Sequence, residues 1–318
     1  MEGWADPFTK HRAPASRADG AASRLNRSRA RPALHPSDRA RGSADAAHTY
    51  TCPMAIKIAV LSQKGGTGKT TAVRHLAECF SRAGLSVLAV DLDPQGNLSD
   101  YFDVDPDAHP TVRDALLGEA KAVDAIHPSV GDVKVIPSNL SLAEAEVGLA
   151  GKMGRELTLR KALRGLDDRF DVILLDCPPN LGLLTINALV AADQALLTSE
   201  AQYFALQGVQ QALEVIDLAR DGLNPDLEWL GVVLTIADMR TVHSREAQAS
   251  LAEHFEDKLL DTVIRQSIAY AESAERGISV LDHRPDLAVD YIELSGELLG
   301  RLGLNDARER LNQAAASV

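Results

Sequence analysis

The chain has few cysteines, no long apolar run and no excess of positive charge. Its 318 residues include three cysteines, Cys52, Cys79 and Cys177, whose spacing matches neither a C-x-x-C motif nor a metal-ligand set. This favours a protein of a reducing cytoplasm. No apolar run approaches the roughly 18 to 20 residues that a membrane-spanning helix needs, so we expect no integral membrane protein and no membrane partner.

Net charge divides the chain near residue 54. The whole sequence carries 33 Lys/Arg and 45 Asp/Glu, a net charge of −12. Residues 1–53 hold nine Lys/Arg and five Asp/Glu (+4), so residues 54–318 hold 24 and 40 (−16). An acidic body of this kind does not suit a protein that grips nucleic acid with its whole surface, and any DNA contact must be a local patch.

Residues 1–53 differ in composition from the rest of the chain. They are rich in Ala, Arg, Ser and Pro and show no sustained apolar periodicity. Such a segment buries too little apolar surface to offset the entropy of ordering, which predicts a disordered basic tail or an over-extended start with Met54 as the natural first residue. A basic arm that touches nucleic acid is the alternative.

One stretch after Met54 has the layout of a phosphate-binding loop. An apolar run at residues 56–61 predicts a buried strand, and a helical pattern follows at residues 72–80. A strand, a glycine loop and a helix N-terminus in this order direct backbone N–H groups and the positive end of the helix dipole at phosphate oxygens. The predicted nucleotide-binding residues are Lys64, Gly65, Gly66, Thr67, Gly68, Lys69, Thr70 and Thr71.

This loop carries two lysines. Lys69 would reach the β- and γ-phosphates of ATP, and the Thr70 hydroxyl would bind Mg²⁺. Gln63 stands where the usual G-x-x-x-x-G-K-[ST] pattern has its first glycine, and Lys64 precedes the glycines. The pattern K-G-G-x-G-K-T-T resembles the deviant Walker A loop of the ParA/MinD group of P-loop ATPases. A glycine turn before an unrelated helix is the alternative interpretation.

Three aspartates follow predicted strands, which is where ligands bind in open α/β sheets. Asp176 ends an apolar run and has the setting of a Walker B acid that holds Mg²⁺. Asp91 and Asp93 follow the second strand and resemble the first switch of the ParA family. That resemblance implies that Asp93 positions the attacking water and that Asp91 supports the water shell of the metal. The predicted catalytic residues are Lys64, Lys69 and Asp93, and the predicted metal residues are Thr70, Asp91 and Asp176.

Short apolar runs alternate with amphipathic stretches from Met54 onward. This alternation predicts an α/β fold over residues 54–318, with a mostly parallel sheet flanked by helices on both faces, as in P-loop NTPases. The later strands are predicted at residues 86–90, 133–136, 171–176, 195–198, 230–235 and 262–264, and the later helices at residues 157–166, 206–219, 244–255, 269–275 and 287–302.

The resemblance extends well beyond the loop. Residues 177–189 read C-P-P-N-L-G-L-L-T-I-N-A-L and are similar to the second switch of chromosome and plasmid partition ATPases of the ParA/Soj type. The likeness spans about residues 56–302. It implies a homodimer formed around ATP, in which Lys64 reaches the phosphates of the partner subunit. It also implies non-specific DNA binding in the ATP-bound state, stimulation by a ParB-like adaptor, and a cytoplasmic protein that associates with the nucleoid.

One segment departs from the family pattern. Where the family commonly reads I-P-R-N-V-R, residues 264–269 read I-R-Q-S-I-A, so two arginines implicated in DNA binding are displaced or lost. Arg265, Arg276, Arg284 and a basic helix at residues 160–164 could rebuild such a patch.

Other functions of the same ATPase group are alternatives. One is a ParA-like positioning ATPase for a cargo other than DNA, acting as a nucleotide-gated scaffold. Another is a MinD-like regulator of the cell-division site, which would need a C-terminal amphipathic helix with a bulky apolar face. Residues 305–318 lack such a face. An iron–sulfur reductase of the nitrogenase type is disfavoured because neither Cys79 nor Cys177 is placed to bridge subunits.

Overall fold

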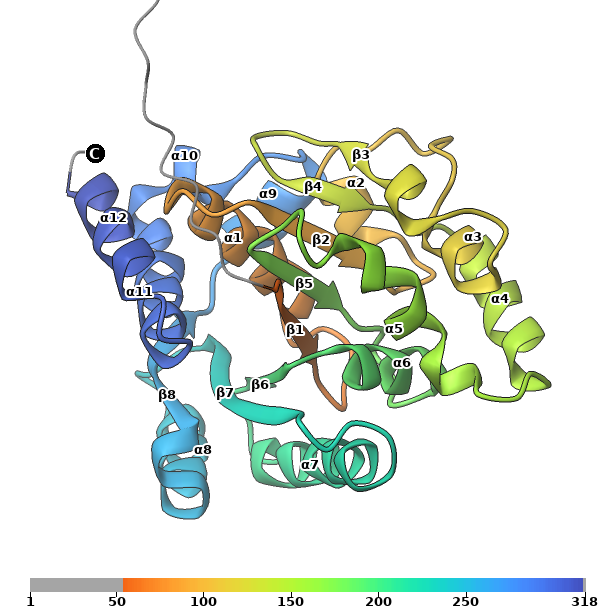
Figure 1. Ribbon diagram of the computed structural model, residues 1–318. Helices are drawn as coiled ribbons and strands as arrows, with labels where there is room; N and C mark the ends of the chain where they lie inside the picture. The colour runs from red at the N-terminus through yellow and green to blue at the C-terminus, as the bar shows by residue number, and fades with distance from the viewer. Residues whose placement is uncertain (1–53, 317–318) are drawn as a thin grey trace, which may run out of the picture. The chain divides into compact units, whose positions relative to one another are not determined.

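A single eight-stranded sheet forms the centre of the computed structural model, which describes residues 54–316 (Figure 1). The strand order is β3-β4-β2-β5-β1-β6-β7-β8, and every neighbouring pair is parallel except β3 with β4. The strands are β1 Ile56–Leu61, β2 Val87–Asp91, β3 His127–Pro128, β4 Lys134–Ile136, β5 Val172–Asp176, β6 Gln194–Glu200, β7 Glu228–Ala237 and β8 Leu259–Arg265.

The central strands are buried on both faces. Every residue of β2 and β5 is buried, and only the first residue of β1 is partly exposed. These strands are continuous apolar runs rather than alternating ones, which is the pattern of a parallel sheet covered on both sides. Because β1 lies between β5 and β6, the carboxyl ends of the strands around it form the crevice where ligands bind in such sheets.

Two apolar cores lie on the two faces of the sheet. One packs the sheet against α1, α2 and the helices from α10 to α12, and the other against the helices from α3 to α8. The helices are α1 Lys69–Arg82, α2 Asn97–Tyr101, α3 Val112–Leu117, α4 Ser141–Ala150, α5 Thr158–Leu163, α6 Leu183–Ala191, α7 Ala205–Gly222, α8 Val242–Phe255, α9 Ala269–Glu275, α10 Val280–His283, α11 Pro285–Arg301 and α12 Asn305–Ala315, and the 3₁₀ turns are η1 Ala122–Ala125, η2 Arg155–Leu157, η3 Arg164–Leu166 and η4 Glu256–Lys258.

The last strand, β8, is an edge of the sheet and is covered by α11. The two carboxylate oxygens of Glu297 accept the backbone N–H groups of Asp261 and Thr262 at 3.0 and 3.1 Å. Asp290 accepts the backbone N–H of Arg265 at 3.1 Å. Backbone donors of this edge strand therefore already have partners from the same chain.

The fold class predicted from the sequence is confirmed, with helices on both faces of a mostly parallel sheet. The helix predicted at residues 157–166 is present only as α5, because the segment divides into η2, α5 and η3, and Gly165 lies in the last of these. Residues 1–53 lie outside the described residues, so the predicted tail and its boundary stay predictions. No helix among residues 54–316 is long and apolar enough to span a membrane.

Candidate nucleotide and magnesium site

The loop between β1 and α1 turns on two glycines. Gly66 and Gly68 have φ values of 78° and 76°, in the left-handed region that favours glycine. Gly68 is the N-cap of α1, and the helix begins at Lys69. Open N–H groups at this helix start are what a phosphate-binding loop requires.

Hydroxyl groups from other strands hold the loop in place. The Thr67 hydroxyl donates to the Ser62 hydroxyl at 2.8 Å and lies 3.0 Å from the hydroxyl of Thr198 on β6. The Thr235 hydroxyl on β7 donates to the Thr67 carbonyl at 2.8 Å. The sequence analysis did not identify Ser62, Thr198 or Thr235, since an isolated serine or threonine carries no pattern that would reveal this role.

The Lys69 side chain lies inside the loop and is 6% exposed. Its ammonium donates to the Ser62 hydroxyl at 3.0 Å and to the Lys64 carbonyl at 3.3 Å. Burial lowers the pKa of Lys69, and the negative charge of Asp176 opposes that shift. A cation held in this position is suited to the β- and γ-phosphates of a nucleotide.

Thr70 and Asp176 form a pair of oxygen ligands. The Thr70 hydroxyl donates to Oδ2 of Asp176 at 2.7 Å, while Oδ1 of Asp176 is buried with no hydrogen-bond partner among the described residues. Burial, reinforced by the negative charge of Asp91, raises the pKa of Asp176 well above its usual range. An unpartnered buried carboxylate oxygen beside a hydroxyl fits a hard divalent cation such as Mg²⁺, which would also relieve the burial of the charge.

Asp91 shapes the loop that follows β2. Its Oδ1 accepts the Asp93 backbone N–H at 3.0 Å, and its Oδ2 accepts the backbone N–H and hydroxyl of Ser99 at 2.9 and 2.7 Å. Burial raises the pKa of Asp91 to about 6, with the Ser99 hydrogen bonds opposing the shift. Both carboxylate oxygens thus have protein partners, and the predicted support of the metal's water shell stays a prediction. The sequence analysis did not identify Ser99.

Asp93 stands beside these groups at the start of α2. It is 9% exposed, and its Oδ1 accepts the Gln95 backbone N–H at 3.0 Å. The Asp93 carbonyl accepts the N–H of Gly96, whose φ of 69° turns the chain into the helix. These bonds fix the carboxylate at the carboxyl end of the sheet, where an attacking water would need to be oriented.

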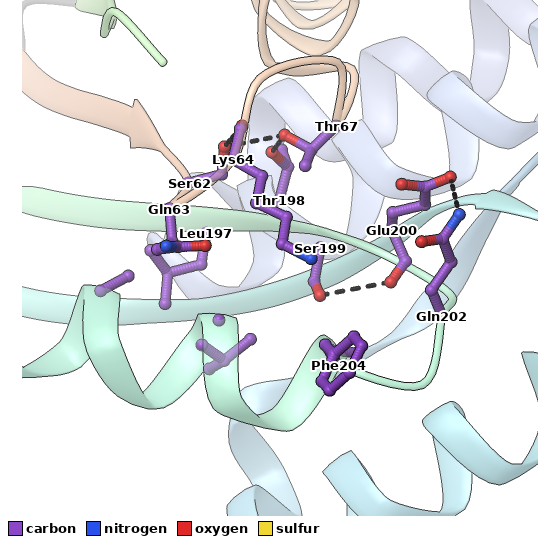
Figure 2. Close-up of a pocket in the computed structure, with 14 residues that line it drawn as sticks. Ser62, Gln63, Lys64, Thr67, Leu197, Thr198, Ser199, Glu200, Gln202 and Phe204 are labelled. Carbon is purple, nitrogen blue, oxygen red and sulfur yellow. Dashed lines mark hydrogen bonds between the residues drawn. The ribbon is translucent and has the colours of Figure 1, made fainter. Parts of the chain in front are cut away.

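Lys64 extends from the loop into a pocket between β6 and α7 (Figure 2). The residue is exposed, and its ammonium lies 5.4 Å from the centroid of the Phe204 ring. Phe204 is itself 56% exposed. The second lysine is therefore held by a cation–π contact at the surface rather than by an ion pair. The sequence analysis did not identify Phe204.

Comparison with known proteins agrees with this geometry. A family model described as an AAA domain matches residues 55–229. The sporulation initiation inhibitor protein Soj of Bacillus subtilis is 38% identical over 245 residues, covering 76% of this chain and 97% of Soj. The chromosome partitioning protein ParA of Caulobacter vibrioides is 35% identical over 266 residues, covering 82% of this chain and 97% of that protein.

The chain belongs to the ParA/Soj family of P-loop ATPases. A solved structure of cobyrinic acid a,c-diamide synthase from Mycobacterium smegmatis with bound ADP and magnesium is also similar, with 38% identity, a TM-score of 0.64, and coverage of 70% of this chain and 93% of that one. Family membership confirms the resemblance to ParA/Soj partition ATPases and the ATPase activity that the sequence predicted.

Some of the basic residues considered for DNA binding in this ParA/Soj-family chain already have partners among the described residues, and others do not. Arg265 pairs with Asp290 at 2.8 Å, and Arg284 pairs with Asp286 at 2.9 Å. Arg160 donates to the Leu223 carbonyl at 3.1 Å. Arg276, at the end of α9, is exposed and has no ion pair with any described residue. Lys161 and Arg164 of the predicted basic helix are exposed and likewise have no ion pair with any described residue.

Proposed function

We propose that this protein is an Mg²⁺-dependent ATPase that forms a homodimer around ATP and acts as a partitioning switch. The observation that carries the proposal is the exposed side chain of Lys64, whose ammonium contacts the Phe204 ring and takes no part in the hydrogen bonds inside the phosphate loop. Lys69 fills the internal position next to the phosphates. An exposed second cation is free to act on a nucleotide bound to another copy of the chain.

The residues of the site support hydrolysis by positioning and electrostatic stabilisation. Bound Mg²⁺, held by Thr70 and Asp176, would neutralise charge on the β- and γ-phosphates of ATP. Lys69 would add positive charge from inside the loop, and Asp93 would orient the attacking water for in-line attack. Lys64 would supply the cation that stabilises charge in the transition state, a contribution of about 10³ to 10⁵ in rate when an arginine provides it.

Two substitutions test this assignment as a matched pair. Lys64→Ala should retain ATP binding, measured with a fluorescent ATP analogue, and lose nearly all phosphate release. Asp93→Ala should also lose hydrolysis but accumulate an ATP-bound dimer, seen as a doubled mass by light scattering. Unchanged turnover in Lys64→Ala would reject the role across subunits, and an ATP-loaded Asp93→Ala protein that stayed monomeric would reject the switch.

The cargo of the switch is proposed from the family. The relatives named Soj and ParA support a cytoplasmic partition protein for chromosome or plasmid DNA, with a ParB-like adaptor that stimulates hydrolysis and with nucleoid association in the ATP-bound state. The MinD-like alternative is disfavoured, because α12 buries Ala307 and Leu311 in the core beside α1 and α11 and so offers no free apolar face. A cargo other than DNA is favoured if the arginines prove inactive.

DNA binding is tested at Arg276, which has no ion pair with any residue that the structure describes. Arg276→Glu should weaken binding of the ATP-loaded protein to a non-specific duplex, while Arg284→Glu, which removes an already paired charge, serves as the control. Binding should fall steeply with salt, since counterion release supplies nearly all non-specific affinity. If neither substitution nor salt changes the fluorescence anisotropy of a labelled duplex, the DNA cargo is rejected in favour of another cargo.

A further inference from the structure

A groove opens between α3, η1, α5 and η3, and it shares no lining residue with the phosphate loop or the three aspartates. Its floor is apolar. Leu166 is buried there, and Leu117, Val123 and Ala162 are partly buried and pack on the core beneath. The floor of the groove is therefore part of the packed core, while Lys121 and Lys152 lie on segments that connect the helices.

Three lysines line this apolar floor. Lys121, Lys152 and Lys161 are all exposed, and none forms an ion pair or side-chain hydrogen bond with any residue that the structure describes. The acidic side chains of the adjoining α3 end are already engaged, because Arg113 binds Asp114 at 2.7 Å and Glu119 at 2.5 Å. The residues that line the groove thus include three lysines and no acidic residue, on a body whose net charge is −16, from 24 basic and 40 acidic residues.

We propose that this groove is a docking site for an acidic amphipathic segment of a partner protein. Carboxylates of such a segment would meet Lys121, Lys152 and Lys161, and its apolar side chains would cover the floor of Leu117, Val123 and Ala162. Peptides that dock as helices in grooves use this combination of apolar anchors and flanking charge. Complementary charge at the rim of an interface raises the association rate and contributes to specificity for the partner.

Other occupants fit the groove less well. Residues 1–53 of this chain carry nine basic and five acidic residues, the same sign as the lysines. Duplex DNA would satisfy the lysines but would place phosphates over an apolar floor and leave that floor uncovered. A second copy has an acidic body, but the helices that the structure describes already pack their apolar faces into its own two cores.

The test uses a fluorescein-labelled synthetic helix of about 18 residues with leucines on one face and glutamates on the other, long enough to form a stable helix when bound. Its fluorescence anisotropy with the full-length protein should rise at moderate salt. Lys121→Glu and Lys161→Glu should each weaken binding by about three- to tenfold, as expected for reversing one charge at an exposed pair. Lys134→Glu makes the same charge change at an exposed position outside the groove and should leave binding unchanged. Ala162→Trp, which fills the floor, should weaken binding as well.

Four outcomes would overturn the proposal. Equal loss of binding in Lys134→Glu, or undiminished binding of a helix with serines in place of leucines, would show attraction by net charge alone. If Lys121→Glu and Lys161→Glu weakened the binding of a labelled DNA duplex and left the binding of the glutamate helix unchanged, the groove would be a nucleic-acid-binding surface. A change in mass of Lys121→Glu or Lys161→Glu by light scattering, with no helix added, would make it a contact between copies.

Discussion

His75 is a fully buried imidazole on α1, one turn beyond the phosphate loop. Its Nδ1 donates to the Thr71 carbonyl at 2.7 Å, and its Nε2 accepts the Val280 backbone N–H at 3.3 Å. The ring stacks on Tyr291 with 4.5 Å between centroids. Burial lowers the pKa of His75 to about 3, although the bond to Thr71 opposes the shift. The imidazole is therefore neutral throughout the physiological range.

This lowered pKa predicts acid sensitivity from one residue. The unfolded chain takes up a proton on His75 near pH 6.5 and the folded chain only near pH 3, so the stability from the neutral ring is complete above pH 6.5 and is lost as pH falls from 6.5 toward 3. At pH 4.5 the loss is about 3 kcal/mol, from two pH units at about 1.4 kcal/mol each.

His75→Phe keeps a ring in the aromatic cluster and removes the titration. We expect a lower free energy of unfolding at pH 7, from two lost hydrogen bonds, but a shallower decline toward pH 4.5 in urea titrations. Parallel declines in the two proteins would show that His75 does not titrate as described.

The residues that sequence could identify are those that carry a pattern of their own. Lys64, Lys69, Thr70 and Asp176 lie in motifs whose spacing reflects the chemistry of phosphate and magnesium, and the structure brings them to one edge of the sheet. Ser99, on α2, donates its hydroxyl to Asp91, but a single serine gives no signal in the sequence. Thr198 and Thr235 come from strands far along the chain, and their place beneath the loop depends on strand register, which one sequence does not reveal.

At the scale of elements, the strongly periodic segments and the seven-residue α9 were predicted, but α4 and the shorter helices α2, α3 and α10 were not. The long helices α7, α8 and α11 and all the central strands lie where apolar periodicity placed them. The short helices α2, α3 and α10 are too brief for a period to appear. The helix α12 was not predicted because its buried stripe consists of Ala307 and Leu311 alone.

The side chain of Asn187 connects α5 through hydrogen bonds to α6, the helix that follows the Asp176 loop. Oδ1 of Asn187 accepts the Thr158 hydroxyl and the Leu159 backbone N–H at 2.9 and 3.1 Å. Its Nδ2 donates to the carbonyls of Arg155 and Leu183, both at 3.0 Å. One fully buried amide thus supplies the partners for the start of α5, where a helix leaves backbone N–H groups unpaired.

Asn187→Ala should lower the free energy of unfolding by about 1 to 3 kcal/mol, because it leaves buried donors and acceptors without partners. Asn312→Ala, at an exposed position of α12, is the control and should change stability little. Urea titrations followed by circular dichroism measure both. An Asn187→Ala midpoint equal to the wild type would show that water replaces the amide at no cost.

For the whole molecule, the alternation of strands and helices determines the class but not the order of strands. Right-handed crossovers limit the arrangements that such a chain can adopt. The position of β1 between β5 and β6, and the antiparallel β3 at one edge, depend on packing that local pattern does not encode. The distribution of charge was visible beforehand, but the pairing of Arg265 with Asp290 was not, since 25 residues separate them in sequence.

Because α11 covers the edge strand β8, we expect a substitution in α11 to change the temperature at which the protein aggregates. Glu297→Ala removes the carboxylate that binds the N–H groups of Asp261 and Thr262, so exposed edge donors become available to other chains. We expect this variant to scatter light at a lower temperature than Glu293→Ala, an exposed control on the same helix. Identical onset temperatures for Glu297→Ala and Glu293→Ala would show that Glu297 is not what prevents β8 from pairing with other chains.

Because carboxylates of α11 occupy backbone donors of the edge strand β8, that edge of the described sheet is a poor site for adding a strand from another copy. The proposed nucleotide-bound pair must instead meet face to face across the loops, a contact that uses the same patch on each copy. Because each copy uses its patch in the dimer, no such patch is left to bind a third copy. The protein would then change reversibly between monomer and dimer, and bound nucleotide as well as protein concentration would control that equilibrium.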